Sequence, residues 1–344
     1  MANAQLPELP AHLALGVDVG GTKIEVSLVD VNGRVVRTQR QATDAVRGSV
    51  HVIGEVVALV EEALHRADAA VDAVGVAVAG QVDAHGTVRG APNLEWIDVP
   101  LRDELERRLA RPVVVLNDVR AAAWAEWYHG AGRGMHDVVV LFLGTGIGGA
   151  AVTDGEMLDG ATNTHGEFGH TTLVAGGRQC HCRNRGCLEA YCAGWSIAER
   201  AQEAARADPA GGAALVRLAG GVEEITAGTV AAARTLGDPL ALALVRETGE
   251  LLGAALVSLI NALNPQRVIL GGGVMDGFPE LRELAEAVAR ARALPAPLEV
   301  LEVVPAALGN HAPAVGAAAA ARRLRALRPP REAVRGMPGP WPAP

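Results

Sequence analysis

Residues 13–35 read LALGVDVGGTKIEVSLVDVNGRV, and this stretch decides how the beginning of the chain folds. Two apolar runs rich in β-branched residues meet at Gly20-Gly21, and Asn32-Gly33 marks a second reversal before the run RVVRTQR. Glycine and asparagine readily adopt the backbone conformations of tight hairpin turns. The spacing therefore predicts three antiparallel strands in a meander, starting at Leu13.

The first turn of this meander is a candidate phosphate site. Residues Gly20, Gly21, Thr22 and Lys23 bring bare backbone N–H groups, a hydroxyl and an ammonium into one tip, which suits an anion. A glycine hairpin is more often only a hairpin, so this signal is weak when taken alone. Asp18, just before the turn, adds a carboxylate that could hold a hydrated magnesium ion.

The second half of the chain repeats this pattern. Residues 136–158, HDVVVLFLGTGIGGAAVTDGEML, again read strand, glycine-rich turn, strand, which indicates a fold that is built twice. Gly144, Gly146 and Gly149 also match G-x-G-x-x-G, but a dinucleotide-binding fold needs a helix after that motif. Because a short run that favours a strand follows instead, we reject that interpretation. Thr145 and Gly146 become candidate contacts to a second phosphate.

A metal site is predicted for residues 166–189, GEFGHTTLVAGGRQCHCRNRGCLE, which hold three of the chain's four cysteines. Zinc prefers four nitrogen or sulfur ligands in a tetrahedron, and His170, Cys180, Cys182 and Cys187 supply them. Such a closed set leaves no position for water, so the metal is expected to be structural. His165 or His181 could replace one of these ligands. A disulfide between two of the cysteines is a less favoured alternative to the metal site.

The same stretch also suggests a site for sugar hydroxyls. An imidazole that gives one nitrogen to a metal presents the other as an N–H donor of fixed direction. Glu167 precedes His170 by three residues and Glu189 follows the last cysteine ligand by two, so a loop folded around a metal would place both carboxylates beside that donor. Vicinal hydroxyls both donate and accept hydrogen bonds, which suits this combination.

Composition limits the class of protein. The 344 residues can bury a sizeable core, on the usual scale of about 100 to 200 residues per domain. The net charge of −8 offers no basic face for nucleic acid. The first residues lack the basic and long apolar regions of a signal peptide, and no apolar run is long enough to span a membrane. Clustered cysteines fit a reducing compartment. We therefore expect a cytoplasmic protein without nucleic-acid or membrane partners.

Further along the chain, Asn117-Asp118 ends the buried run VVVLN just before a predicted helix. Open α/β sheets place working groups at the carboxyl ends of such strands, although Asp118 could equally do no more than cap the helix. The glycines Gly271, Gly272 and Gly273 lie in the predicted strand RVILGGGV and would let a flat group approach the backbone, or would only form a tight turn between this strand and a helix.

The remaining elements are predicted from periodicity. Strands are expected at 71–78, 113–117, 267–274 and 298–304, with helices at 49–67, 101–109, 189–205, 226–236, 240–263, 280–293 and 312–327. We expect a turn-rich segment at 82–96 and a loose one at 208–221. The domains are expected to be a mobile lead at 1–12, an N-terminal α/β domain at 13–133, a larger C-terminal α/β domain with the zinc loop at 134–327, and a disordered Pro-rich tail at 328–344. Helix 312–327 could pack back on the first domain.

Together, GEFGH, CHCRNRGCLE and the two glycine turns resemble the ROK family of bacterial sugar kinases and related repressors. The resemblance covers roughly residues 13–327 and implies an α/β, duplicated actin/hexokinase-like (ribonuclease H-like) fold of two domains with an interdomain cleft. By position it implies Asp118 as general base and adds Gly80, Asn93 and Asn117 to Glu167, His170 and Glu189 as sugar ligands. It also implies that His170, Cys180, Cys182 and Cys187 bind zinc, that the two glycine turns bind phosphate, and that Gly271–Gly273 contact adenosine.

The implied activity is of the glucokinase type, with ATP and Mg²⁺ used to phosphorylate a hexose, D-glucose to glucose 6-phosphate. N-acetylmannosamine, N-acetylglucosamine, mannose or fructose as substrate, polyphosphate as donor, and a non-catalytic sugar-sensing regulator are alternatives. About twelve residues precede the first strand, too few for the helix-turn-helix of the family's repressors. This sequence departs from the family pattern at four positions. The family usually has glycine in place of Arg183 and Ala150, often glycine in place of His181, and more commonly proline in place of Ala79. The oligomeric states that are usual in the family suggest a homodimer or homotetramer.

Overall fold

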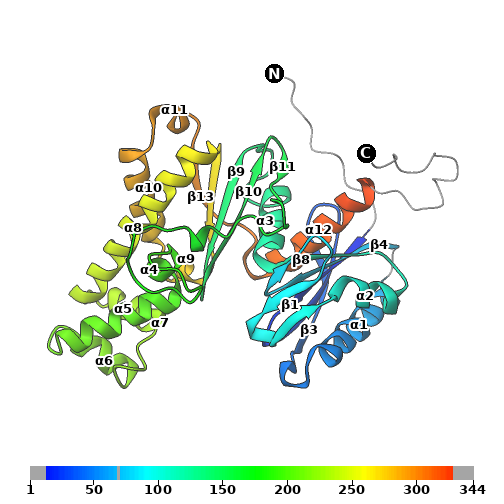
Figure 1. Ribbon diagram of the computed structural model, residues 1–344, viewed down its shortest axis with the longest axis horizontal. Coiled ribbons are helices and arrows are strands. Elements are labelled where there is room, and N and C mark those ends of the chain that lie inside the picture. Colours follow the sequence, from blue (N-terminus) through cyan, green and yellow to red (C-terminus); the bar gives the residue numbers. More distant parts are fainter. Residues whose placement is uncertain (1–12, 68–69, 328–344) are drawn as a thin grey trace. The chain divides into compact units, whose positions relative to one another are not determined.

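The computed structural model describes residues 13–67 and 70–327, which fold into two compact units (Figure 1). The described residues up to Ala122 and those from Pro313 onward form the N-terminal unit, and Ala123–Ala312 form the C-terminal unit. The expected lead at 1–12 and tail at 328–344 lie outside the described residues. Within the described part of the chain, no helix combines the length and the apolar character that crossing a membrane requires.

A five-stranded sheet in the order β3-β2-β1-β4-β8 forms the N-terminal unit. The strands are β1 (Leu13–Val19), β2 (Lys23–Val29), β3 (Val35–Ala42), β4 (Val71–Val78) and β8 (Val113–Asn117). The first three are antiparallel neighbours, which confirms the predicted meander, and β4 and β8 run parallel to β1. The carboxyl ends of the three parallel strands therefore share one edge of the sheet.

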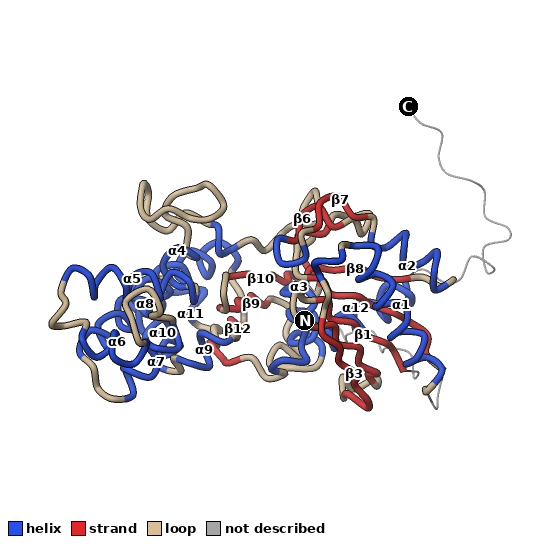
Figure 2. Tube along the Cα trace, turned by 90° about the horizontal axis from the view of Figure 1, so that it is seen from below, coloured by secondary structure: helices blue, strands red, loops and turns tan. Residues whose placement is uncertain are grey.

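Helices cover this sheet on both faces (Figures 1 and 2). They are α1 (Ser49–His65), α2 (Leu101–Leu109) and α12 (Ala312–Leu327), with short turns η1 (Ala45–Arg47) and η2 (Pro92–Leu94). From Pro313 on, α12 lies so close to β1 and β4 that a Cβ added to Gly16 or Gly75 would run into its backbone. The buried guanidinium of Arg322 donates to the carbonyl groups of Val29 and Asp30 and fixes this helix on the sheet.

The turn-rich segment holds a small sheet that the sequence prediction missed. Its strands are β5 (Gln81–Val82), β6 (Val88–Ala91) and β7 (Trp96–Val99), paired antiparallel. The strands are only two to four residues long, too short for an alternating pattern to stand out from the turns.

The C-terminal unit repeats the first sheet in the order β11-β10-β9-β12-β13. The strands are β9 (Val138–Leu143), β10 (Ile147–Thr153), β11 (Glu156–Met157), β12 (Arg267–Gly271) and β13 (Glu302–Pro305). Again the first three are antiparallel, and the next two are parallel to the first. The predicted duplication is thus confirmed. A strand, β10, follows the glycine motif, so the rejection of a dinucleotide-binding fold is also confirmed.

Most of the remaining chain of this unit is helical, and its helices pack on the second sheet and on one another (Figure 2). The helices are α3 (Asp118–Tyr128), which starts in the N-terminal unit, α4 (Glu189–Cys192), α5 (Gly194–Ala207), α6 (Ala213–Ala219), α7 (Ala227–Thr235), α8 (Pro239–Leu263), α9 (Gly273–Gly277), α10 (Glu280–Arg292) and α11 (Pro295–Leu298), with η3 (Phe168–His170) and η4 (Gly309–His311). Predicted helices at 101–109 and 312–327 have these bounds in the structure.

Three predictions for this unit were wrong. The single helix expected at 189–205 is two helices, because Ala193 has an extended backbone between α4 and α5. The segment 208–221 is not loose, because α6 forms within it and buries Leu215 in the core. The expected strand at 298–304 begins only at Glu302, because Pro295 starts a short helix instead. Proline fits the first turn of a helix, where its missing N–H is not needed, and this outweighs the β-branched pattern that follows.

Candidate active site

The predicted site residues of the N-terminal unit gather where its parallel strands end. Val19 of β1 pairs with Val78 of β4, and Val78 pairs with Asn117 of β8, so the three strands end in one row. The ends of these strands and the segments that follow them carry the predicted residues. They are Asp18, Gly20, Gly21, Thr22, Lys23, Gly80, Asn117 and Asp118. One edge of the sheet thus presents carboxylates beside glycine-rich backbone, as open α/β sheets do at their working edge.

Asn117 and Asp118 have different roles at the start of α3. The side-chain oxygen of Asn117 accepts the N–H of Arg120 at 3.0 Å and so caps the helix. Its amide group donates to the carbonyl of Gly80 at 3.0 Å and to Oδ1 of Asp118 at 2.9 Å, and that Oδ1 also accepts the N–H of Val119. The cap that the helix needs is therefore supplied by Asn117, while the Asp118 carboxylate is held in a fixed orientation.

A buried carboxyl group lies next to the first glycine turn. Burial raises the pKa of Asp18 to about 6, against the lowering effect of Lys23, and the nearby charges of Asp118 and Glu25 raise it further. The ammonium of Lys23 lies 4.0 Å from Asp18 Oδ2 and 3.5 Å from Glu25 Oε2. A site where carboxylates outnumber cations in this way is suited to a divalent metal ion.

Glu25 is a component of this edge that the sequence reasoning missed. It is fully buried and accepts from Arg40 Nε at 2.6 Å and from Ser27 Oγ at 3.3 Å. Lys23, Glu25 and Ser27 alternate with apolar residues along β2, a pattern typical of a solvated face. A charged residue two positions after the predicted phosphate-binding turn was the available signal.

The first glycine turn has the features of an anion site. Gly20 donates its N–H to the carbonyl of Lys23 at 2.9 Å, and the hydroxyl of Thr43 donates to the carbonyl of Gly20 at 2.7 Å. Among the described residues, the N–H groups of Gly21 and Thr22 have no hydrogen-bond partner. The backbone of Asn93 lies against Gly21, where a Cβ would meet its carbonyl oxygen at 2.5 Å. Two adjacent N–H groups are thus left for an anion.

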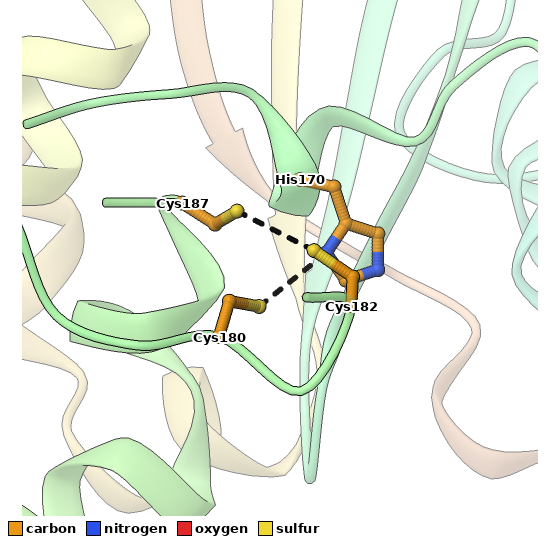
Figure 3. A group of neighbouring side chains, drawn as sticks. All are labelled: His170, Cys180, Cys182 and Cys187. Atoms are coloured by element: carbon orange, nitrogen blue, oxygen red, sulfur yellow. Dashed lines mark hydrogen bonds between the residues drawn. The ribbon is translucent and has the colours of Figure 1, made fainter. Parts of the chain in front are cut away.

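The C-terminal unit brings the four predicted metal ligands together (Figure 3). His170 lies on the short turn η3, and Cys180, Cys182 and Cys187 come from the loop that follows. The Nδ1 atom of His170 is 3.7 Å from Cys180 Sγ, and the Sγ atoms of Cys182 and Cys187 are 3.6 Å apart. All four ligand atoms lie within 4.8 Å of one another.

The distances of 3.7 Å and 3.6 Å match those between the ligands of a tetrahedral zinc ion. Bonds of about 2.3 Å to sulfur and about 2.0–2.1 Å to nitrogen place ligand atoms about 3.5–3.8 Å apart. Burial raises the pKa of the Cys180 and Cys187 thiols, so thiolates at these positions need a cation beside them. Because Nδ1 of His170 faces the sulfur atoms, its Nε2 is left for a different partner (Figure 3).

The two alternative metal ligands, His165 and His181, are not part of the cluster of four ligand atoms. The ring of His181 stacks on Trp195, with ring centroids 4.1 Å apart, and His165 packs edge-on against Phe168. All four cysteines are free thiols, so none forms a disulfide. Arg183 has a φ of 75°, a left-handed conformation that favours glycine.

Two carboxyl groups accompany His170. Burial raises the pKa of Glu167; the charge of His170 opposes this shift and that of Glu189 adds to it, so the three side chains influence one another. Glu189 is buried at the start of α4, where its Oε2 accepts the N–H of Ile147 at 2.8 Å and its Oε1 lies 3.9 Å from Cys180 Sγ. The predicted neighbourhood of one imidazole and two acids is therefore present.

The second glycine turn, at residues 144–146, lies beside the glycine run Gly271–Gly273. Gly144 donates to the carbonyl of Gly146 at 2.9 Å, and the N–H groups of Thr145 and Gly146 have no partner among the described residues. Gly272, with a φ of 93°, lies against the carbonyl of Leu143, and Gly271 pairs with Phe142. Around Gly273, by contrast, a Cβ would meet no atom within 4 Å. The carboxyl edge of β9 and β12 thus repeats the arrangement of the first sheet.

Two copies of one five-stranded sheet, each with a glycine turn at its edge, define the duplicated α/β class that includes actin and hexokinase. The chain belongs to the ROK family, whose family model matches residues 14–324.

Its relatives share this architecture over nearly their full length. The chain is 35% identical to a glucokinase of Streptomyces coelicolor over 313 residues, which is 90% of this chain and 98% of that protein. Among solved structures, it is similar to a ROK glucokinase from Streptomyces griseus in complex with glucose and AMPPNP, with a TM-score of 0.75, 36% identity, and coverage of 90% and 99%. A ROK hexokinase from Thermus thermophilus has a TM-score of 0.79, 31% identity, and coverage of 92% and 99%. Within the family, the chain is thus a sugar kinase of the bacterial glucokinase kind, an ATP:hexose phosphotransferase.

Proposed function

We propose that the protein transfers the γ-phosphoryl group of ATP to the 6-hydroxyl of D-glucose. The observation that carries this proposal is Asp118, a carboxylate oriented by Asn117 and Val119 at the edge of a parallel sheet, while the helix cap is supplied by Asn117. Asp118 accepts the hydroxyl proton as the sugar oxygen attacks phosphorus. Such a positioned base contributes about 10²- to 10⁴-fold to the rate.

The other residues bind and align the substrates. Glu167, His170 and Glu189 bind hydroxyl groups of the sugar, together with Gly80, Asn93 and Asn117. The N–H groups of the two glycine turns bind phosphate oxygens, and Gly271–Gly273 contact the adenosine. Since the transition state of phosphoryl transfer is loose, most of the acceleration comes from alignment and from neutralising charge.

Two metals are part of the proposal. His170 and the three cysteines would hold zinc, which would order the loop that carries the sugar ligands and fix which nitrogen of His170 bears the proton. The closed set of four protein ligands supports a structural role. Asp18 would hold Mg²⁺ through water, and the ion would compensate the charge of the polyphosphate chain.

The Asp18 assignment predicts an unusual effect on stability. A carboxyl group whose pKa is raised to about 6 in the folded protein costs stability as the pH rises from about 4 through 6, and the full cost remains above that range. Asp18→Asn is therefore expected to raise the free energy of unfolding by about 1–3 kcal/mol near pH 8, and to have almost no effect near pH 4. The same variant should bind MgATP more weakly.

Thermal unfolding at several pH values, without Mg²⁺, measures this effect. Asp30→Asn is a matched control, because Asp30 accepts two backbone N–H groups in a turn of the same unit and should show no gain at high pH. A lower melting temperature for Asp18→Asn near pH 8 would show that this carboxylate stabilises the fold and would contradict its assignment to a metal site.

A panel of sugars and phosphoryl donors tests the whole proposal. Purified protein is incubated with glucose, mannose, fructose, N-acetylglucosamine or N-acetylmannosamine and with ATP or polyphosphate, and sugar phosphate formation is measured. We expect glucose with ATP to give the highest kcat/KM. A different preferred sugar or donor would replace that part of the proposal. Sugar binding without turnover for every pair would favour the non-catalytic regulator.

Location and assembly follow from the same family likeness. The proposed kinase acts in the cytoplasm on small molecules, as a homodimer or homotetramer. Light scattering coupled to gel filtration measures the oligomeric state.

A further inference from the structure

Glu189 connects two parts of the C-terminal unit that the proposed function treats separately. Its Oε1 lies 3.9 Å from Sγ of the metal-ligand residue Cys180, and its Oε2 accepts the N–H of Ile147 at 2.8 Å. Ile147 directly follows the second glycine turn. One buried carboxylate therefore contacts both the metal cluster and the backbone of the proposed phosphate site.

The turn fits closely around this carboxylate. A Cβ added to Gly146 would lie 2.7 Å from Glu189 Oε2, which is closer than real Cβ contacts come. At Gly144, two residues earlier, an added Cβ would meet no atom within 4 Å. A side chain at Gly146 would therefore displace the Glu189 carboxylate from its present position, whereas the space around Gly144 is open.

The segment that carries His170 also contacts Ile147, the residue that follows the second glycine turn. Gly169 packs on Ile147, where a Cβ would lie 2.9 Å from the Ile147 side chain. The start of α5 adds a third contact, because Gly194 donates to the carbonyl of Gly144 at 2.8 Å. The glycine turn is therefore contacted by Gly169, which is next to the ligand His170, by Glu189, two residues after the ligand Cys187, and by Gly194 at the start of α5.

We propose that Glu189 is a positioning residue that couples the metal cluster to the second glycine turn. The metal then organises the site for the nucleotide phosphates as well as the site for the sugar. This inference rests on the proposed function only in taking residues 144–147 as a phosphate site. Because coupling between two sites is reciprocal, loss of metal should weaken nucleotide binding, and disturbance of the turn should loosen the metal.

The effect of the turn on the metal is tested by comparing Gly146→Ala with Gly144→Ala. Both add one methyl group to the same turn, and neither residue ligates the metal. The readout is the rate of zinc release to a chromogenic chelator, which needs no turnover. We expect Gly146→Ala to release zinc at least about tenfold faster than wild type, and Gly144→Ala to stay within about twofold. Equal release rates for the two variants would overturn the proposal, as would a wild-type protein that binds no zinc.

The effect of the metal on the turn is tested by nucleotide binding. The dissociation constant of a non-hydrolysable ATP analogue is measured for Cys182→Ala, with Cys192→Ala as control, since Cys192 is a buried cysteine outside the metal cluster. We expect an increase of at least about tenfold for the first variant only. A folded, metal-free Cys182→Ala with unchanged affinity would also overturn the coupling. If wild type bound no nucleotide, the proposed function would fail, while the comparison of zinc release would still decide the coupling.

Discussion

Asp118→Asn is expected to lower kcat by about 10²- to 10⁴-fold while the protein stays folded and still binds glucose. The substituted amide keeps an oxygen that can accept the N–H groups of Asn117 and Val119, so the local hydrogen bonds survive. What is lost is the ability to take a proton from the sugar hydroxyl. The effect should therefore fall on kcat, with little change in the sugar dissociation constant.

Calorimetric titration with glucose and a coupled assay of ADP release measure the two quantities separately. Asp30→Asn again serves as control, since it removes a carboxylate from the same unit at a position with no proposed role in the reaction. Turnover within about threefold of wild type in folded Asp118→Asn would refute the assignment. Loss of both sugar binding and the cooperative unfolding transition in Asp118→Asn would instead indicate a structural role.

Cys182→Ala is expected to release the metal and to raise the sugar dissociation constant by at least about 100-fold. The apparent binding free energy of a structural zinc ion is of the order of 10–16 kcal/mol in small zinc domains, so the loop that it orders depends on it strongly. His170 lies on the turn η3 just before this loop, and Glu189 starts the helix α4 just after it. Treatment of wild-type protein with a strong chelator should reproduce the effect, and added zinc should reverse it.

Comparison with Cys192→Ala makes this test sharp. Cys182 is exposed and Cys192 is fully buried, so ordinary core packing predicts that the second substitution is the more harmful one. Metal ligation predicts the opposite order. Elemental analysis of the two variants, together with melting temperatures and sugar affinities, decides between them. Retained metal and unchanged affinity in Cys182→Ala would contradict the zinc assignment.

Features that depend on neighbours in the sequence could be predicted well. The meander at residues 13–42 was predicted from its turn residues and apolar periodicity, and its repetition from internal similarity. The four proposed metal ligands lie within eighteen residues, on one loop and the turn before it, and the structure places their ligand atoms together. Residue type and spacing were sufficient in both cases, because turns and short loops bring such groups together locally.

Features that depend on burial could not be predicted from the sequence. The alternation of Lys23, Glu25 and Ser27 with apolar residues is typical of a solvated face, yet Glu25 and Ser27 are fully buried. The sequence also left open whether Asp118 caps α3, because the choice between two adjacent polar residues depends on the geometry at the end of β8. The structure assigns that cap to Asn117.

By itself, the sequence determined the duplicated α/β architecture and the family, and it predicted which side chains carry metal and sugar chemistry, because hydrophobic periodicity, turn residues and ligand spacing are local properties of the chain. Only the tertiary structure decided how these parts are connected. The hydrogen bond from Ile147 to Glu189 joins residues 42 positions apart, and the close approach of Gly146 to the same carboxylate has no local signature. Such contacts arise when packed elements exclude water and buried polar groups must find partners, which no single stretch of sequence specifies.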